Sequence, residues 1–134
     1  MSSKTRTFIA VHIAVLTVSD SRTTANDKSG DLLVNRLTST GHVLADRKIV
    51  KDDLKQIRSV ISRWIDDTDI QVAITTGGTG VTGFDGTPEA IEPLFQKKLD
   101  GFGEIFRALS FEEIGTSALQ SRAMAGVANG TYLF

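Results

Sequence analysis

The stretch FIAVHIAVLTV, residues 8–18, decides the fold because it is almost continuously apolar and rich in β-branched residues. A continuous run of this kind is typical of a strand that is buried on both faces of a parallel sheet. His12 interrupts the run, and we interpret it as a packing histidine of the core rather than as a site residue. The polar residues 19–22 follow the strand at its carboxyl end, which is where open α/β sheets bind their ligands.

Strand and helix patterns alternate along the chain after this first strand. Strands are expected at residues 43–50 and 70–75. A helix is expected over residues 31–40, and another begins at Thr87, which we expect to be its N-cap because a proline and a glutamate follow. This alternation is the pattern of βαβ units.

A further helix between the two later strands is indicated by apolar residues at helical spacing. They are Ile57, Val60, Ile61, Trp64 and Ile65. Trp64 belongs to this stripe, so we assign it to the core. Asp52 and Asp53 precede the helix, and either side chain could cap it. Capping therefore competes with a catalytic role for these carboxylates.

The C-terminal third predicts a change from parallel to antiparallel pairing. After a loop with two glycines, short helices are expected at residues 104–109 and 117–122. Asn129-Gly130 then separates segments 123–128 and 131–134, which is a strong hairpin signal. The whole pattern predicts an α/β sandwich with right-handed crossovers, a mostly parallel sheet and one antiparallel hairpin.

Composition limits both the architecture and the classes of function. The chain has 134 residues, of which 40% are hydrophobic, so we expect residues 1–134 to form a single domain. No cysteine is present, which excludes disulfides and cysteine zinc sites and fits a reducing compartment such as the cytoplasm. Fifteen basic and sixteen acidic residues give no broad nucleic-acid footprint. The longest apolar run is too short to cross a membrane.

A glycine-rich stretch, TTGGTGVTG at residues 75–83, follows the third expected strand and precedes Asp85. Glycine allows a ligand to approach the main chain closely, and exposed amides there can bind anionic oxygens. We interpret the stretch as a phosphate-binding turn that acts together with carboxylates. The alternative is an ordinary turn at the end of a strand.

Known nucleotide motifs do not explain this stretch. Gly78, Gly80 and Gly83 satisfy G-x-G-x-x-G. That fingerprint should lie in the first βα unit and lead directly into a helix, but here the expected helix begins only at Thr87. A P-loop would require Gly-Lys-Ser/Thr after the glycines, which is missing. A magnesium-bridged phosphate, with oxygen ligands on the metal and main-chain amides on the anion, fits the remaining residues.

Several motifs together carry a family resemblance. They are TTGGTG at 75–80, Asp85 before Thr87-Pro88-Glu89-Ala90, GFGE at 101–104, and GTSALQSRAMAGV at 115–127. From Phe8 to Phe134 the chain resembles the MoaB/Mog family of molybdenum cofactor biosynthesis. The segment from Glu104 to Asn129 resembles the bacterial MoaB branch more closely than the MogA branch.

The resemblance implies a three-layer α/β/α fold that binds molybdopterin. In active relatives it also implies adenylylation of molybdopterin with Mg²⁺ and ATP, so the chain would be a nucleotidyltransferase. Asp52 and Asp85 would be the catalytic carboxylates and would hold the metal. The phosphate turn and the mouth of the site would bind the pterin and the nucleotide through Thr76, Gly77, Gly78, Thr79, Gly80, Ser19, Asp20, Arg22, Lys28 and Ser29.

Two other functions stay open from the residues. One is a noncatalytic molybdopterin-binding or assembly protein of the same pathway, and the other is a generic nucleotide-binding enzyme. The resemblance implies a cytoplasmic homotrimer or homohexamer with small-molecule partners, and neither nucleic acid nor membrane. Apolar residues that could line a subunit interface or the core, for which we favour the core, are Phe102, Ile105, Phe106 and Phe111.

The sequence departs from the family pattern at two places. Gly86 stands where relatives usually carry a larger residue between the aspartate and the residue before proline. Family members also continue past the position of Phe134 with a Pro-Gly-Ser/Asn motif and a closing helix. We therefore expect that this sequence lacks the C-terminal strand–helix end of the domain.

Overall fold

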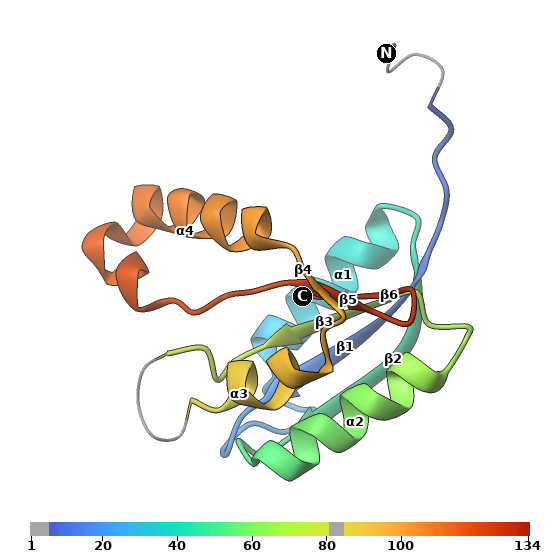
Figure 1. Ribbon diagram of the computed structural model, residues 1–134, viewed down its shortest axis with the longest axis horizontal. Helices are drawn as coiled ribbons and strands as arrows, with labels where there is room; N and C mark the ends of the chain where they lie inside the picture. Colours follow the sequence, from blue (N-terminus) through green and yellow to red (C-terminus); the bar gives the residue numbers. More distant parts are fainter. Residues whose placement is uncertain (1–5, 81–84) are drawn as a thin grey trace.

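The computed structural model describes residues 6–80 and 85–134, and these form one six-stranded sheet in the order β2-β1-β3-β6-β5-β4 (Figure 1). The strands are β1 His12–Val18, β2 Val43–Val50, β3 Val72–Thr76, β4 Lys97–Lys98, β5 Gly126–Ala128 and β6 Thr131–Leu133. Strands β2, β1, β3 and β6 run parallel, while β5 is antiparallel to both β6 and β4. The expected mostly parallel sheet with a C-terminal antiparallel hairpin is confirmed.

Helices cover both faces of the sheet, which confirms the three-layer α/β/α arrangement (Figure 1). The helices are α1 Lys28–Ser39, α2 Leu54–Asp66, α3 Thr87–Ile91 and α4 Asp100–Ile114, with 3-10 helices η2 Glu92–Leu94 and η3 Gly115–Gln120. One core cluster joins β1 to α2 and α3, and the second joins β1 to α1. No helix in the described part of the chain is long and apolar enough to span a membrane.

Strand β1 lies between β2 and β3, and every residue from Ile13 to Val18 is buried. The predicted doubly buried strand is therefore confirmed, although it begins at His12 rather than at Phe8. The interpretation of His12 as a core histidine is wrong, because its side chain is exposed at the amino end of the strand. Its Nδ1 atom lies 3.0 Å from the carbonyl oxygen of Asp69, so it contacts a surface turn.

The hairpin follows from its turn residues. Asn129 has φ 49° and Gly130 has φ 79°, the left-handed conformations that a tight two-residue hairpin needs at both positions. Beyond the turn, the Phe134 carbonyl oxygen accepts hydrogen bonds from both the amide and the hydroxyl of Thr75. The hairpin thereby joins the parallel part of the sheet beside the strand that leads into the glycine turn.

Trp64 is confirmed as a core residue. Its side chain is 4% exposed, and its indole Nε1 donates to Asp46 Oδ2 at 3.0 Å. The hydrogen bond satisfies the one polar atom of the ring, so the whole side chain can be buried at little cost. This contact fixes α2 against β2.

The predicted boundaries fail around α4. Gly101 and Gly103 lie inside its first turn rather than in a loop, and the helix continues to Ile114. A β-carbon on Gly103 would come within 2.7 Å of the Ala123 carbonyl oxygen, so this glycine allows close chain packing instead of a turn. The helix expected at residues 117–122 is the 3-10 helix η3, which ends at Gln120.

Helix α4 and η3 form an arm that projects away from the sheet (Figure 1). Our preference for the core is wrong for Ile105, Phe106 and Phe111, which are exposed by 65%, 43% and 56%. Phe102 is half-buried, and its ring contacts those of Phe106 and Phe134. The arm therefore carries a large apolar surface that the described chain does not cover.

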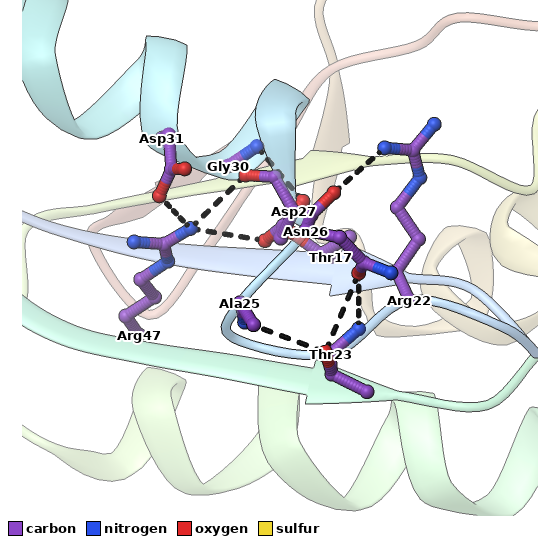
Figure 2. Close-up of polar contacts among 9 residues, drawn as sticks. All are labelled: Thr17, Arg22, Thr23, Ala25, Asn26, Asp27, Gly30, Asp31 and Arg47. Carbon is purple, nitrogen blue, oxygen red and sulfur yellow. Dashed lines mark hydrogen bonds and ion pairs between the residues drawn. The ribbon is translucent and has the colours of Figure 1, made fainter.

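An ionic cluster around the buried Asp27 fixes the loop between β1 and α1 (Figure 2). The carboxylate of Asp27, fully buried, accepts hydrogen bonds from Thr17 Oγ1, the Gly30 amide and Arg47 Nη2 at 2.7, 3.0 and 3.1 Å. Asp27 is thus the N-cap of α1, which explains why this helix begins at Lys28, three residues before the predicted start. Arg47 also donates to Asp31 at 2.7 Å.

Removal of the buried carboxylate should destabilise the fold. We expect Asp27→Ala to lower the free energy of unfolding by about 3 kcal/mol, because it removes the N-cap of α1, leaves the buried Thr17 hydroxyl without its acceptor, and takes from the partly buried Arg47 its buried ion-pair partner. Asp31→Ala is the matched control, since it removes the other acceptor of Arg47 but is half-exposed. Its cost should stay below about 1 kcal/mol. Urea unfolding measures both, and equal losses would contradict the assignment.

The same cluster predicts the acid response of the fold. Burial alone would raise the pKa of Asp27, but the hydrogen bonds from Thr17, Gly30 and Arg47 outweigh it and lower this pKa below the usual value of an aspartate. A lowered pKa contributes stability that is complete above the unfolded value and is lost as pH falls through the folded value. We expect urea midpoints measured from about pH 6 to about pH 3 to fall more steeply for the wild type than for Asp27→Asn. Parallel curves would contradict this.

Candidate functional site

The site is built around the glycine turn that follows β3. Gly77 and Gly78 have φ values of 97° and 69°, which side chains rarely adopt. A β-carbon on Gly77 would lie 2.2 Å from the Val18 carbonyl oxygen, and one on Gly78 would lie 2.2 Å from Thr87 Oγ1. The sequence therefore needs glycine at both positions for this turn to lie against the ends of β1 and α3.

Thr87 holds the turn in place. Its hydroxyl donates to the Gly77 carbonyl at 2.8 Å, and its amide donates to the Gly78 carbonyl at 3.1 Å. The prediction that Thr87 is the N-cap of α3 is wrong, because Gly86 occupies that position and Thr87 is the first helical residue. The hydroxyl binds the glycine turn instead of capping the helix.

The carboxylate of Asp52 faces the same turn. Its Oδ1 accepts from the Gly86 amide at 3.0 Å, and its Oδ2 lies 3.1 Å from the position of a β-carbon on Gly78. The Asp52 amide in turn donates to Asp20 Oδ1 at 3.1 Å. Asp53 is the N-cap of α2, but its side chain makes no capping hydrogen bond. Helix capping therefore does not explain Asp52, whose side chain is directed to the turn.

Negative charge gathers around the turn. Burial, and then the charges of Asp20, Asp85 and Glu89, raise the pKa of Asp52, while the hydrogen bond from the Gly86 amide opposes this. Asp85 lies against the turn, since its Oδ2 would be 2.8 Å from a β-carbon on Gly80. The structure thus brings the two candidate catalytic carboxylates to the same turn, Asp52 beside Gly78 and Asp85 beside Gly80, and the cluster would favour a bound cation.

The described residues do not form a metal site that the protein completes by itself. Within residues 6–80 and 85–134 there is no group of three or more His, Asp or Glu side chains that could hold a metal ion. Mg²⁺ is usually bound by one or two carboxylates together with substrate phosphates and water. Asp52 and Asp85 could supply such a pair of oxygen ligands.

A cavity of about 620 Å³ borders the other side of the turn. This volume suits a small organic ligand. Most of its wall is apolar and comes from α1, α3, α4 and Phe134. The predicted binding residues that line it are Ser29, Thr76, Gly77 and Thr79.

The remaining predicted residues lie outside this cavity wall. Asp20 binds the Asp52 backbone, and Gly78 and Gly80 contact the two carboxylates. Ser19 Oγ accepts from the Arg22 amide at 3.1 Å, and the Arg22 guanidinium donates to the Asn26 carbonyl at 2.9 Å (Figure 2). These two residues order their own loop. Lys28 is exposed at the start of α1, and Gly83, the last glycine of G-x-G-x-x-G, lies outside the described residues.

Sequence reasoning missed one residue that touches the turn, Arg122. Its guanidinium donates to the carbonyls of Gly80 and Asp85, and its amide donates to the Thr79 carbonyl. The one available signal was that Arg122 is the only charged residue in GTSALQSRAMAGV, residues 115–127. The sequence alone does not indicate which carbonyl oxygens the Arg122 side chain binds.

Comparisons with known proteins agree with this arrangement. The family model described as "Probable molybdopterin binding domain" matches residues 14–133. Molybdenum cofactor biosynthesis protein B of Escherichia coli K12 is 52% identical over 134 residues, which are 100% of this chain and 79% of that protein.

Solved structures give the same result. A crystal structure of molybdenum cofactor biosynthesis protein B superposes with a TM-score of 0.92 at 40% identity, covering 96% of this chain and 81% of that one. The tungsten cofactor synthesizing protein MoaB from Pyrococcus furiosus has a TM-score of 0.82 at 39% identity, covering 93% and 80%. The chain therefore belongs to the MoaB/Mog family of molybdenum cofactor biosynthesis proteins and carries its molybdopterin-binding domain.

Proposed function

We propose that the protein is a molybdopterin adenylyltransferase that uses Mg²⁺ and ATP. The observation that carries this proposal is that Asp52 and Asp85 both lie beside one glycine turn, which also borders a cavity of ligand size. Two carboxylates and a main-chain turn supply oxygen ligands for a metal and amide donors for phosphates. This combination suits transfer between two phosphorylated molecules.

The reaction needs positioning more than proton transfer. An oxygen of the terminal phosphate of molybdopterin attacks the α-phosphorus of ATP and forms a new P–O bond. The bond from that phosphorus to the oxygen bridging to the β-phosphate breaks, and pyrophosphate leaves with the electron pair. No general base is required, because the attacking phosphate is already anionic. The protein must hold the two phosphates in line.

Each part of the site has a role in this scheme. Asp52 and Asp85 would hold Mg²⁺, whose chemistry is to neutralise charge on the reacting phosphates. The main-chain amides of residues 77–80 would bind phosphate oxygens, and the apolar cavity beyond Thr76 and Thr79 would receive the pterin. Since ATP is supplied in the cytoplasm, the proposal places the protein there.

The proposal is tested by incubating the purified chain with molybdopterin, ATP and Mg²⁺. Adenylylated pterin together with pyrophosphate would support catalysis. Tight pterin binding without pyrophosphate release would overturn catalysis and leave a noncatalytic binding or assembly protein of the pathway. Specific binding of a nicotinamide cofactor without pterin binding would instead indicate a generic nucleotide-binding enzyme.

We also propose that the protein is a homotrimer or homohexamer assembled through the α4–η3 arm. Large apolar side chains on this arm are exposed to an extent that monomers rarely show. The most exposed are Ile105, Leu109, Ile114 and Leu119, at 65%, 61%, 59% and 83%. Burial of this surface against a second copy would remove it from water and stabilise the arm.

Substitution of the two carboxylates should separate activity from stability. We expect Asp52→Asn and Asp85→Asn each to lower kcat by about 100-fold, because both lose a charged metal ligand, with the thermal midpoint within roughly 3 °C of wild type. Asp53→Ala is the matched control, since it is adjacent and exposed and makes no capping hydrogen bond. Its kcat should stay within roughly twofold. Loss of stability in proportion to activity would indicate a structural role instead.

Charge introduced on the arm should break the assembly. We expect Leu109→Lys to shift the mass measured by light scattering from trimer or hexamer to monomer, because a lysine cannot be buried unpaired in an apolar interface. Ile9→Lys is the control, as Ile9 is 73% exposed but lies far from the arm in sequence and outside any helix or strand. An assembly that persists in Leu109→Lys, or that is lost equally in Ile9→Lys, would contradict the proposed interface.

A further inference from the structure

Arg122 lies where the chain returns from the α4–η3 arm toward β5. It donates hydrogen bonds to four residues. Its amide donates to the Thr79 carbonyl at 2.9 Å, and its Nε donates to the Gly80 carbonyl at 2.6 Å. Its Nη2 donates to the Asp85 carbonyl, and its Nη1 reaches both carboxylate oxygens of Glu89 at 2.7 and 2.8 Å.

These contacts connect the two ends of the candidate site. Gly80 ends the described part of the glycine turn, and Asp85 is the candidate metal ligand beyond it. One guanidinium binds the backbone carbonyls of both residues. The guanidinium therefore sets the distance between the Asp85 backbone and the turn. That distance in turn sets where the Asp85 carboxylate lies beside Gly80.

The ion pair with Glu89 orients the guanidinium rather than stabilising the fold. The side chains of Arg122 and Glu89 are 35% and 49% exposed. Pairs this exposed contribute only about 0–1 kcal/mol to stability. Glu89 lies in the first turn of α3, so the backbone of that helix fixes the position from which its carboxylate meets the guanidinium.

Arginine suits this task and lysine does not. The planar guanidinium presents several N–H donors in fixed directions, so it can bind two carbonyls and a carboxylate at once. A lysine ammonium is a point charge on a flexible stem and cannot reproduce this geometry. Because Nε, Nη1 and Nη2 all donate to protein acceptors, Arg122 affects the site indirectly, through the positions of Gly80 and Asp85.

We propose that Arg122 is a positioning residue that holds the Asp85 backbone at a fixed place beside the glycine turn. Its effect on turnover rests on the proposed adenylyl transfer, whereas its effect on the backbone does not. A misplacement of about 1 Å in a reacting geometry can cost about 100-fold in rate. Loosening of Asp85 should therefore lower kcat more than it weakens substrate binding.

The test compares Arg122→Lys with Arg58→Lys. Arg58 is the matched control, because it also donates to backbone carbonyls at α3, those of Glu89 and Ala90, but does not touch the turn. We expect Arg122→Lys to lower kcat by about 10- to 100-fold with KM for ATP changed by less than about threefold. Arg58→Lys should leave kcat within roughly twofold.

Amide hydrogen exchange supplies a readout that needs no activity. The Gly86 amide donates to Asp52 and the Thr87 amide donates to the Gly78 carbonyl, so both report on the backbone beside Asp85. Both should exchange about tenfold faster in Arg122→Lys, and at the wild-type rate in Arg58→Lys. Glu89→Gln, which leaves Arg122 without a charged partner, should also speed the exchange of both amides, but by less than Arg122→Lys does.

The outcomes separate this inference from the proposed function. Unchanged exchange at Gly86 and Thr87 in Arg122→Lys would overturn the positioning role, whatever the enzyme does. Equal effects of Arg122→Lys and Arg58→Lys on exchange and kcat would also overturn it, because they would indicate a general loss of packing. If the wild type forms no adenylylated pterin, the proposed activity fails, and the exchange rates alone then decide the role of Arg122.

Discussion

The close approach of the glycine turn to its neighbours is the constraint on which the site depends. A β-carbon at Gly77 would lie 2.2 Å from the Val18 carbonyl, so only a bare backbone can cross the end of β1 at this point. The parallel pairing of β1 with β3 places the two strand ends together, and the Thr87 hydroxyl then fixes the turn from the side of α3. Strand β2 is parallel to β1, so its carboxyl end lies at this same edge of the sheet. Asp52 follows β2 there and can therefore face the turn.

Two polar networks of different character support this turn. Asp27 is fully buried, and its hydrogen bonds fix α1 and the loop after β1 at the cost of desolvating a charge (Figure 2). The ion pair of Arg122 with Glu89 is partly exposed and contributes little to stability, whereas its hydrogen bonds to the backbone carbonyls define the geometry between Gly80 and Asp85. The acidic side chains around the turn repel one another in the chain alone, which is a cost expected of a site that binds a cation and phosphates.

Several failures of sequence reasoning have the same physical cause. Thr87 and Asp53 have the residue types of helix caps, yet neither side chain makes a capping bond. Gly101 and Gly103 have the type of loop residues but begin a helix. For Thr87 and Gly103, a contact with another part of the chain outweighs the local preference. Local preferences amount to about 1 kcal/mol or less per residue, so tertiary contacts easily override them.

The sequence by itself determined the strand that is buried on both faces, the hairpin at Asn129-Gly130, the core position of Trp64 and the family, because these depend on local periodicity, turn chemistry and shared motifs. It also identified Asp52 and Asp85 as candidates through the resemblance. Only the tertiary structure decided that Asp52 faces the turn rather than a helix end, that the arm is exposed, and that Arg122 joins Gly80 to Asp85. These features depend on contacts between residues more than thirty positions apart or on the docking of a whole helix, and no local pattern encodes such contacts.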